Sequence, residues 1–310
     1  MGIEFTPEKL IDRDAEQEIF EKLLKHEDDA RLLTICDAGG HGKSELLKRL
    51  QYNCIYRFNT PVSLIELQNL DSTSPFELIS KIRGALRGDF SNLKFDGYDE
   101  FNNARRDQDS SKFGAYSGSV VGSVPAQGAT IGGSGNIVAG VLVQNPQGPV
   151  NLPPIVWGPE KEESARQKCV DAFFEDLKQI CREETVVILL DTWERCNTVL
   201  QKWVLDTLLR VHCFDLNRRP ERLVLVLAGR TENFPDFQIR LDKRYQLLVR
   251  SIVSFGEWDE NHVKDFLSLH GYERLANNDE DVKYLCQKIR KGMSLQYALQ
   301  VVEEHLAKVS

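Results

Sequence analysis

The most informative part of the sequence reads Asp37-Ala38-Gly39-Gly40-His41-Gly42-Lys43-Ser44. An apolar run, residues 31–36, precedes it, and a helical pattern follows it through Gln51. The pattern G-x-x-x-x-G-K-[ST] must lie between a strand and a helix if its backbone amides are to wrap a phosphate. Asp37 stands at the first glycine position, so its carboxylate must point away from the phosphates or be paired. The octapeptide predicts a phosphate-binding loop; an incidental Gly-rich turn is the alternative.

Such a loop assigns chemistry to two side chains and calls for a partner strand. Lys43 would reach the β- and γ-phosphates, and the Ser44 hydroxyl would bind magnesium. A second buried strand should end in an acid that contacts the metal through water, and residues 186–190 lead directly into Asp191. We therefore expect ATP or ADP with Mg²⁺ as ligands, with Ser44 and Asp191 at the metal. The alternative for Asp191 is a turn residue that ends a strand.

Two further side chains are candidates for catalysis. Glu194 follows Asp191 by three residues and could orient or deprotonate the attacking water. Arg230 ends a third apolar strand, residues 223–228, where a cation can contact the γ-phosphate and report its loss. The alternatives are a solvated helix start for Glu194 and a surface arginine for Arg230.

The remaining pattern predicts a parallel sheet covered on both faces. Strand candidates at 31–36, 61–67, 185–190 and 222–228, and a mixed one at 245–253, alternate with helical patterns. We expect helices at 74–86, with Ser74-Pro75 as cap and first-turn residue, at 162–182 and at 198–209. From Asp259 onward only helical periodicity remains, which predicts a small helical lid with helices at 279–290 and 294–308.

One segment departs from this organisation. From Phe113 to Pro159 there is no charged residue and no His, and the segment holds 10 of the 21 Gly and 6 of the 11 Pro. Its Gly-Ser-rich start favours a mobile linker, whereas residues 136–145 have the composition of a strand that could serve association. We expect an N-terminal domain part at 1–88, an insertion at 89–159, a C-terminal domain part at 160–255 and a lid at 256–310.

Composition limits the class of protein. The chain has 310 residues, 41% hydrophobic and 28% charged, which indicates a globular protein with a core. Its net charge of −8 provides no global attraction to nucleic acid or to an anionic membrane. No apolar run reaches the roughly 20 residues of a membrane span, and no signal peptide is evident at Met1. Seven cysteines without a C-x-x-C pair indicate buried thiols in the cytoplasm.

Together, the phosphate loop, the acidic strand and the third strand resemble the STAND class of P-loop ATPases, AAA+ relatives that include NACHT and NB-ARC proteins. Leu10-Ile11-Asp12-Arg13 resembles the family's entry motif, and Asp191-Thr192-Trp193-Glu194 its second acidic motif. Ala228-Gly229-Arg230 is similar to its sensor strand, and Phe255–Asp259 to the start of its lid. At Lys291-Gly292-Met293-Ser294-Leu295, Ser294 occupies the proline position of the family's Gly-x-Pro-Leu.

The resemblance implies a nucleotide site and a switching function. Nucleotide contacts would come from Ile11 and Arg13 and from the loop residues Gly39, Gly40, His41, Gly42, Lys43, Ser44 and Glu45. Such a protein holds ADP when off, and exchange for ATP opens it into a homo-oligomer that drives a protein effector or sensor partner. The chain starts near the entry motif and ends just after the lid, so we expect an excised module or a minimal ATPase that acts through partners.

Two other functions stay open. One is a nucleotide-binding scaffold with little turnover, to which Asp37 and Thr192 (in place of a second adjacent acid) lend weight. The other is a nucleic-acid-remodelling AAA+ protein, for which Arg105-Arg106, Arg218-Arg219 and residues 222–243 could form basic patches. Because the net charge is acidic, we expect nucleic acid not to be a partner, and we expect no membrane partner either.

Overall fold

The computed structural model describes residues 13–37, 42–70, 74–113, 159–231, 247–253, 255–290 and 295–309. Its centre is a five-stranded sheet in which every pairing is parallel and the order is β2-β3-β4-β1-β5. Each strand overlaps one of the five segments that the sequence predicts as strands. The strands are β1 (Leu32–Asp37), β2 (Val62–Glu66), β3 (Val186–Asp191), β4 (Leu223–Arg230) and β5 (Val249–Ile252).

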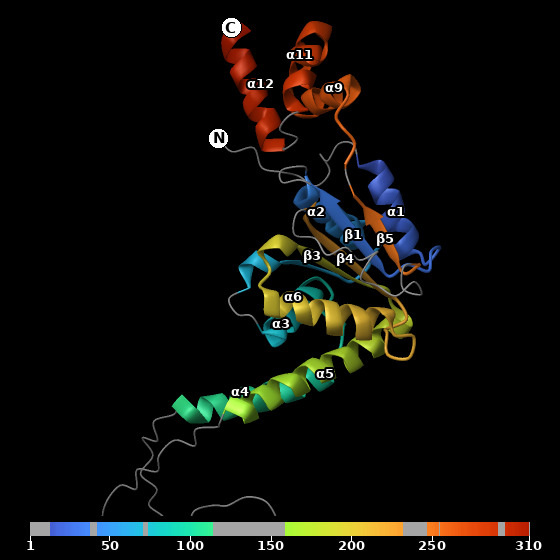
Figure 1. Ribbon diagram of the computed structural model, residues 1–310, viewed down its shortest axis with the longest axis vertical. Coiled ribbons are helices and arrows are strands. Elements are labelled where there is room, and N and C mark those ends of the chain that lie inside the picture. The colour runs from blue at the N-terminus through green and yellow to red at the C-terminus, as the bar shows by residue number, and fades with distance from the viewer. Residues whose placement is uncertain are drawn as a thin grey trace, which may run out of the picture.

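Helices cover both faces of this sheet (Figure 1), because alternate residues of a buried strand point to opposite sides. In β3, Val186, Ile188 and Leu190 belong to one core cluster, and Val187 and Leu189 belong to the other. The second cluster includes α1 (Asp14–Leu24) and α2 (Lys43–Tyr56). The first includes α3 (Pro75–Asp89), α4 (Asp96–Phe113), α5 (Pro159–Glu183), α6 (Thr198–Trp203) and its π-helical continuation η4 (Val204–Phe214).

Helix α4 lies in the segment that the sequence analysis assigns to the insertion, yet it packs along α5 (Figure 1). Leu93, Phe95 and Tyr98 are buried in the core cluster that α3 and α5 share. The Asp176 carboxylate of α5 accepts hydrogen bonds from the backbone N–H of Gly97 and Tyr98, at 3.4 and 2.8 Å. Residues 93–98 are therefore part of the domain core. The uncharged window is the segment from Phe113 to Pro159, and its residues 114–158 lie outside the described part of the chain.

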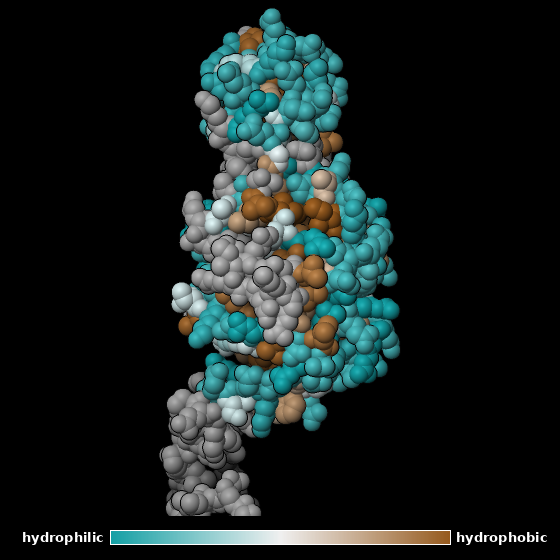
Figure 2. Space-filling model, turned by 45° about the vertical axis from the view of Figure 1, so that its right-hand side comes forward, coloured by the Kyte–Doolittle hydropathy of each residue, from teal (hydrophilic) through white to brown (hydrophobic). Residues whose placement is uncertain are grey.

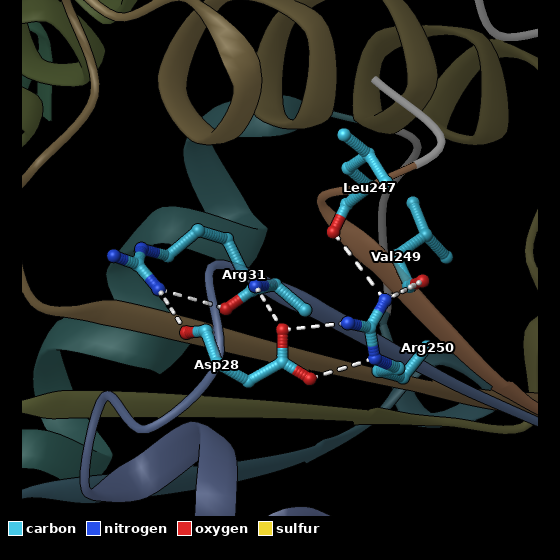
Figure 3. Close-up of polar contacts among 6 residues, drawn as sticks. Asp28, Arg31, Leu247, Val249 and Arg250 are labelled. Carbon is cyan, nitrogen blue, oxygen red and sulfur yellow. Dashed lines mark hydrogen bonds and ion pairs between the residues drawn. The ribbon is translucent and has the colours of Figure 1, made fainter. Parts of the chain in front are cut away.

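Strand β5 is an edge strand whose first half is fixed to the loop before β1 (Figure 3). Arg250 pairs with both carboxylate oxygens of Asp28, through Nε and Nη2, each at 2.7 Å. The Arg250 Nη1 also donates to the Val249 carbonyl at 3.2 Å. Further along, the Thr34 hydroxyl of β1 donates to the Ser251 hydroxyl at 2.8 Å. These contacts hold β5 in register beside the phosphate-loop strand.

The C-terminal helices form a lid with a core of its own, which runs from Trp258 to Val302. Asp259 caps the first of them by accepting the His262 N–H, while the His262 ring accepts the Asp259 N–H. Figure 2 shows the lid as a separate lobe whose surface on this face is mostly hydrophilic. The helices are α9 (Glu260–Leu269), α10 (Glu273–Ala276), α11 (Asp279–Ile289) and α12 (Leu295–Val309). The structure thus confirms the expected fold class of a P-loop α/β sheet followed by a small helical lid.

All seven cysteines are buried free thiols. Within the described ranges, no helix combines the length and the apolar character needed to cross a bilayer.

Candidate functional site

The candidate site lies at the carboxyl edge of the sheet, where β1, β3 and β4 end next to one another. The order β3-β4-β1 places the sensor-like strand between the phosphate-loop strand and the acidic strand. In this register Asp37 lies beside Arg230, and Leu190 lies beside Leu227. The strand ends thus bring the predicted lysine, acids and arginine to one edge, although they are far apart in sequence.

Lys43 is the first residue of α2, and its side chain is almost fully buried. Gly42 before it has φ +83°, a left-handed conformation that favours glycine and lets the loop enter the helix. The Lys43 ammonium donates to the backbone carbonyl of Asp37 at 2.8 Å. Burial lowers the pKa of Lys43, and the nearby carboxylates of Asp37, Glu194 and Asp191 act to raise it. The lysine is therefore a buried cation near acids from the ends of β1 and β3 and from the turn that follows β3.

Asp191 at the end of β3 is 4% exposed. Its carboxylate accepts a hydrogen bond from the Ser44 hydroxyl and one from the Thr192 N–H, the latter at 2.7 Å. Burial raises the pKa of Asp191, the two hydrogen bonds lower it, and the charges of Glu66 and Glu194 raise it further. Glu66 ends β2 and is the register partner of Asp191. Sequence reasoning missed this acid, although a carboxylate at the end of a buried run could have revealed it.

These groups fit a divalent cation that is shared with phosphate. A buried carboxylate joined to a serine hydroxyl, with two further acids nearby, is an arrangement that a cation would stabilise. No three His, Cys, Asp or Glu side chains among the described residues could hold a metal by themselves. Magnesium in nucleotide sites is commonly bound through one or two protein oxygens, with phosphate oxygens and water completing the shell. Ser44 and Asp191 are of the kind that such a shell requires.

The turn after Asp191 is strained. Thr192 has φ 59° and ψ 45°, a left-handed conformation that is a genuine outlier for a β-branched residue. Its hydroxyl donates to the Asp191 carbonyl at 2.7 Å and accepts the Gln68 N–H at 3.3 Å. The same turn allows the Thr192 N–H to reach the Asp191 carboxylate. The strained residue therefore orients Asp191 and sets where the chain continues toward Glu194.

Glu194 and Arg230, the two other predicted catalytic residues, contact each other. The Arg230 Nε lies 3.0 Å from the Glu194 Oε1, and the Arg230 backbone N–H donates to Oε2 at 3.2 Å. The side chain of Glu194 is 11% exposed and that of Arg230 is 45% exposed. Glu194 is thus a largely buried acid at the site, which differs from the solvated helix start that was its alternative.

The other residues predicted to contact nucleotide belong to the entry motif, the phosphate loop and the start of α2. Gly39, Gly40, His41 and Ile11 lie outside the described residues. Glu45 lies in the first turn of α2. Arg13 is buried, and its guanidinium lies over the Phe255 ring, 4.1 Å from the centroid. Arg13, the last residue of the entry motif, is therefore packed against Phe255 at the start of the lid connection.

Comparison with known proteins supports the fold. No family model and no curated protein matches the sequence. The crystal structure of Cdc6p from Pyrobaculum aerophilum matches with a TM-score of 0.51 and 12% identity, over 97% of this chain and 62% of that one. A structure of Drosophila ORC bound to DNA matches with a TM-score of 0.43 and 13% identity, over 98% of this chain and 63% of that one. This chain therefore spans less than two thirds of either protein.

The Cdc6p similarity supports the fold that the sequence predicts, and the AAA+ relationship stays a prediction. At 12% identity this similarity concerns the fold alone. The STAND, NACHT or NB-ARC assignment stays a prediction. The expectation that nucleic acid is not a partner gains no support from these similarities.

Proposed function

We propose that this chain binds ATP and ADP with Mg²⁺ at the carboxyl edge of the sheet and hydrolyses ATP as a STAND-type switch. One observation carries the proposal: Lys43, Ser44, Asp191, Glu194 and Arg230 converge there from α2 and the ends of β3 and β4. A buried lysine at a helix N-terminus opposite a buried acid is the arrangement that polyphosphate recognition requires.

Each side chain has a role that follows from its position. The Lys43 ammonium would turn from the Asp37 carbonyl to the β- and γ-phosphates. Ser44 and Asp191 would hold the magnesium, which when bound neutralises charge on the phosphates. Glu194 would accept a proton from the attacking water or orient it, and Arg230 would contact the γ-phosphate.

The ion pair between Glu194 and Arg230 supports a link between sensing and hydrolysis. The Arg230 guanidinium pairs with Oε1 of Glu194, and the Arg230 backbone N–H donates to Oε2. A γ-phosphate competes with that carboxylate for the guanidinium, because both are anions that arginine binds through the same N–H groups. Drawing the Arg230 guanidinium to the phosphate would therefore release Oε1 of Glu194 to act on water, while Oε2 keeps the backbone N–H of Arg230.

The switch would couple nucleotide state to assembly. We infer a homo-oligomer in the ATP state and an effector or sensor protein as partner, in the cytoplasm. The test is identification of the nucleotide that copurifies with the protein, together with its size by light scattering in ATP and in ADP. Bound adenine nucleotide and a larger species in ATP are expected. An identical size in both nucleotides would contradict the switch.

A scaffold with little turnover is the second candidate, and two observations favour it. Thr192 occupies the position next to Asp191 where a second acid could lie. Glu194, the remaining candidate base, is held by Arg230. Single-turnover phosphate release separates the two: a switch releases phosphate from bound ATP, whereas a scaffold retains ATP intact.

A further inference from the structure

The connection from β5 to the lid is short. Within a few residues it passes from the core that packs on the sheet to the core of the lid. Phe255 is buried in the cluster that packs α1 and α2 on the sheet. Trp258 is buried in the lid core. Only Gly256 and Glu257 lie between them, so any rotation of the lid relative to the sheet must be absorbed close to Phe255. Phe255 is therefore the residue at which the lid is anchored to the sheet.

The Asp37 carboxylate fixes that anchor. Its Oδ2 accepts the Phe255 backbone N–H at 2.8 Å, and the two residues are 7% and 6% exposed. A hydrogen bond to an ionised acceptor is roughly twice as strong as a neutral one, and losing the acceptor leaves a buried N–H unsatisfied. Arg13 lies over the ring of the same Phe255. The carboxylate at the first position of the phosphate-loop pattern thus points to the lid connection.

Asp37 also contacts Lys43, the lysine proposed to bind phosphate, through its backbone carbonyl group. Its backbone carbonyl accepts the Lys43 ammonium at 2.8 Å, and the charge of Asp37 acts to raise the pKa of Lys43. A lysine that turns to a phosphate withdraws both the donor and the positive charge from Asp37. One residue therefore contacts both Lys43 and Phe255, where the lid is anchored to the sheet.

We propose that Asp37 is a positioning residue that transmits phosphate occupancy at Lys43 to the lid through the Phe255 amide. The proposal rests on the proposed function for its nucleotide-dependent part. The structure shows the contact between Asp37 and Phe255 directly. Glycine, which the phosphate-loop pattern has at this position, has no side chain to make that contact.

Hydrogen exchange at the Phe255 amide, followed by NMR in the nucleotide-free chain, tests the contact. Asp37→Gly should raise the exchange rate by roughly tenfold or more, because the amide loses its acceptor. Asp37→Asn should restore most of the protection, since its Oδ1 still accepts. Thr34→Val is the matched control, because it removes another hydrogen bond between β1 and β5 and leaves Asp37 intact. Equal exchange at Phe255 in wild type and Asp37→Gly would overturn the proposal.

The same measurement at saturating Mg²⁺ and a slowly hydrolysed ATP analogue tests the coupling. In wild type, exchange at Phe255 should increase when the analogue binds, and the change should be absent in Asp37→Gly and present in Thr34→Val. An analogue that binds and leaves Phe255 unchanged in wild type overturns the coupling alone. A chain that binds no nucleotide overturns the proposed function and the coupling with it, while the nucleotide-free comparison still decides the Asp37 contact.

Discussion

Asp191 illustrates how a residue that we propose to bind magnesium can lower the stability of the folded protein. Burial and the charges of Glu66 and Glu194 raise the pKa of its carboxyl group. The hydrogen bonds from Ser44 and Thr192 lower that pKa, but only in part, so the net effect is a raised pKa. The buried charge is therefore unfavourable in the nucleotide-free protein. A bound cation would reverse that, because it supplies the opposite charge where the acids converge.

We expect Asp191→Asn to stabilise the nucleotide-free protein at neutral pH and to abolish magnesium-dependent nucleotide binding. The folded chain holds a proton on Asp191 above the usual pKa of 3.8, so this stabilisation is present below pH 3.8 and is lost as the pH rises through the raised pKa. Asparagine avoids that loss. A gain of about 1 kcal/mol, or roughly 2–4 °C in Tm, is the expected scale.

Thermal unfolding of both proteins at neutral pH and near pH 3.8 measures this effect. The advantage of the variant should be larger at neutral pH than near pH 3.8. A variant with a lower Tm than wild type at neutral pH would show that the buried charge is already compensated.

Glu194→Gln should retain bound ATP and lose turnover. Losing a positioned general base typically costs about 10²–10⁴-fold in rate. Glutamine keeps an oxygen that can accept from Arg230, so the turn should stay in place. Glu66→Gln is the matched control, an acid at the neighbouring strand end for which we propose no contact with the water. If single-turnover phosphate release is equally fast in wild type and Glu194→Gln, Glu194 has no part in the reaction.

At the scale of elements, two substitutions at Thr192 test whether the backbone of the turn is strained. Thr192→Ala and Thr192→Gly both remove the hydroxyl, so their difference isolates the left-handed conformation at φ 59°. Glycine should be more stable than alanine by about 1 kcal/mol, because a Cβ is disfavoured there. Urea unfolding measures the difference. Greater stability of the alanine variant, as at an ordinary position, would show that the turn is not strained in solution.

The strands were predictable because their signal is local. Residues 186–190 and 223–228 are continuous apolar runs, and such runs form strands that are buried on both faces. Helix α4 was not predicted, because its sequence is polar and its packing depends on Asp176, about eighty residues away. The predicted helix at 198–209 is α-helical only over Thr198–Trp203 and π-helical over Val204–Phe214, a change of hydrogen bonding that no periodicity of the sequence indicates.

The site residues also divide into those that a local motif predicts and those that only the fold brings together. Lys43, Ser44 and Asp191 could be predicted because each occupies a fixed place in a strand or helix motif. The proximity of Glu66 to Asp191 depends on β2 pairing with β3, and the hydrogen bond from Phe255 to Asp37 joins residues 218 apart. Sheet order and long-range hydrogen bonds of this kind are set by the assembled fold, so the sequence alone could not give them.

At the scale of the whole molecule, the lid and the α4–α5 pair lie at opposite ends (Figure 1). The uncharged window joins the C-terminal end of α4 to the N-terminal start of α5, far from the end of β1. Deleting residues 114–154 should therefore leave the Kd for nucleotide within about twofold, a change of roughly 0.4 kcal/mol. Loss of nucleotide binding would contradict this separation.

The same deletion decides between the two interpretations of the window. If it serves assembly, the ATP-dependent size distribution in light scattering should shift to smaller species. If that distribution is unchanged, the window is a linker and the assembly role is wrong.

The central claim is that the carboxyl edge of the sheet is an adenine-nucleotide site built around Lys43. Titration calorimetry with Mg-ATP tests it on three folded proteins: wild type, Lys43→Ala, and Lys48→Ala, which removes a positive charge from the same helix outside the proposed site. Wild type and Lys48→Ala should bind one ATP each. Lys43→Ala should bind at least about tenfold more weakly, because it loses charge-assisted hydrogen bonds to phosphate. Equal affinity of wild type and Lys43→Ala would contradict the claim.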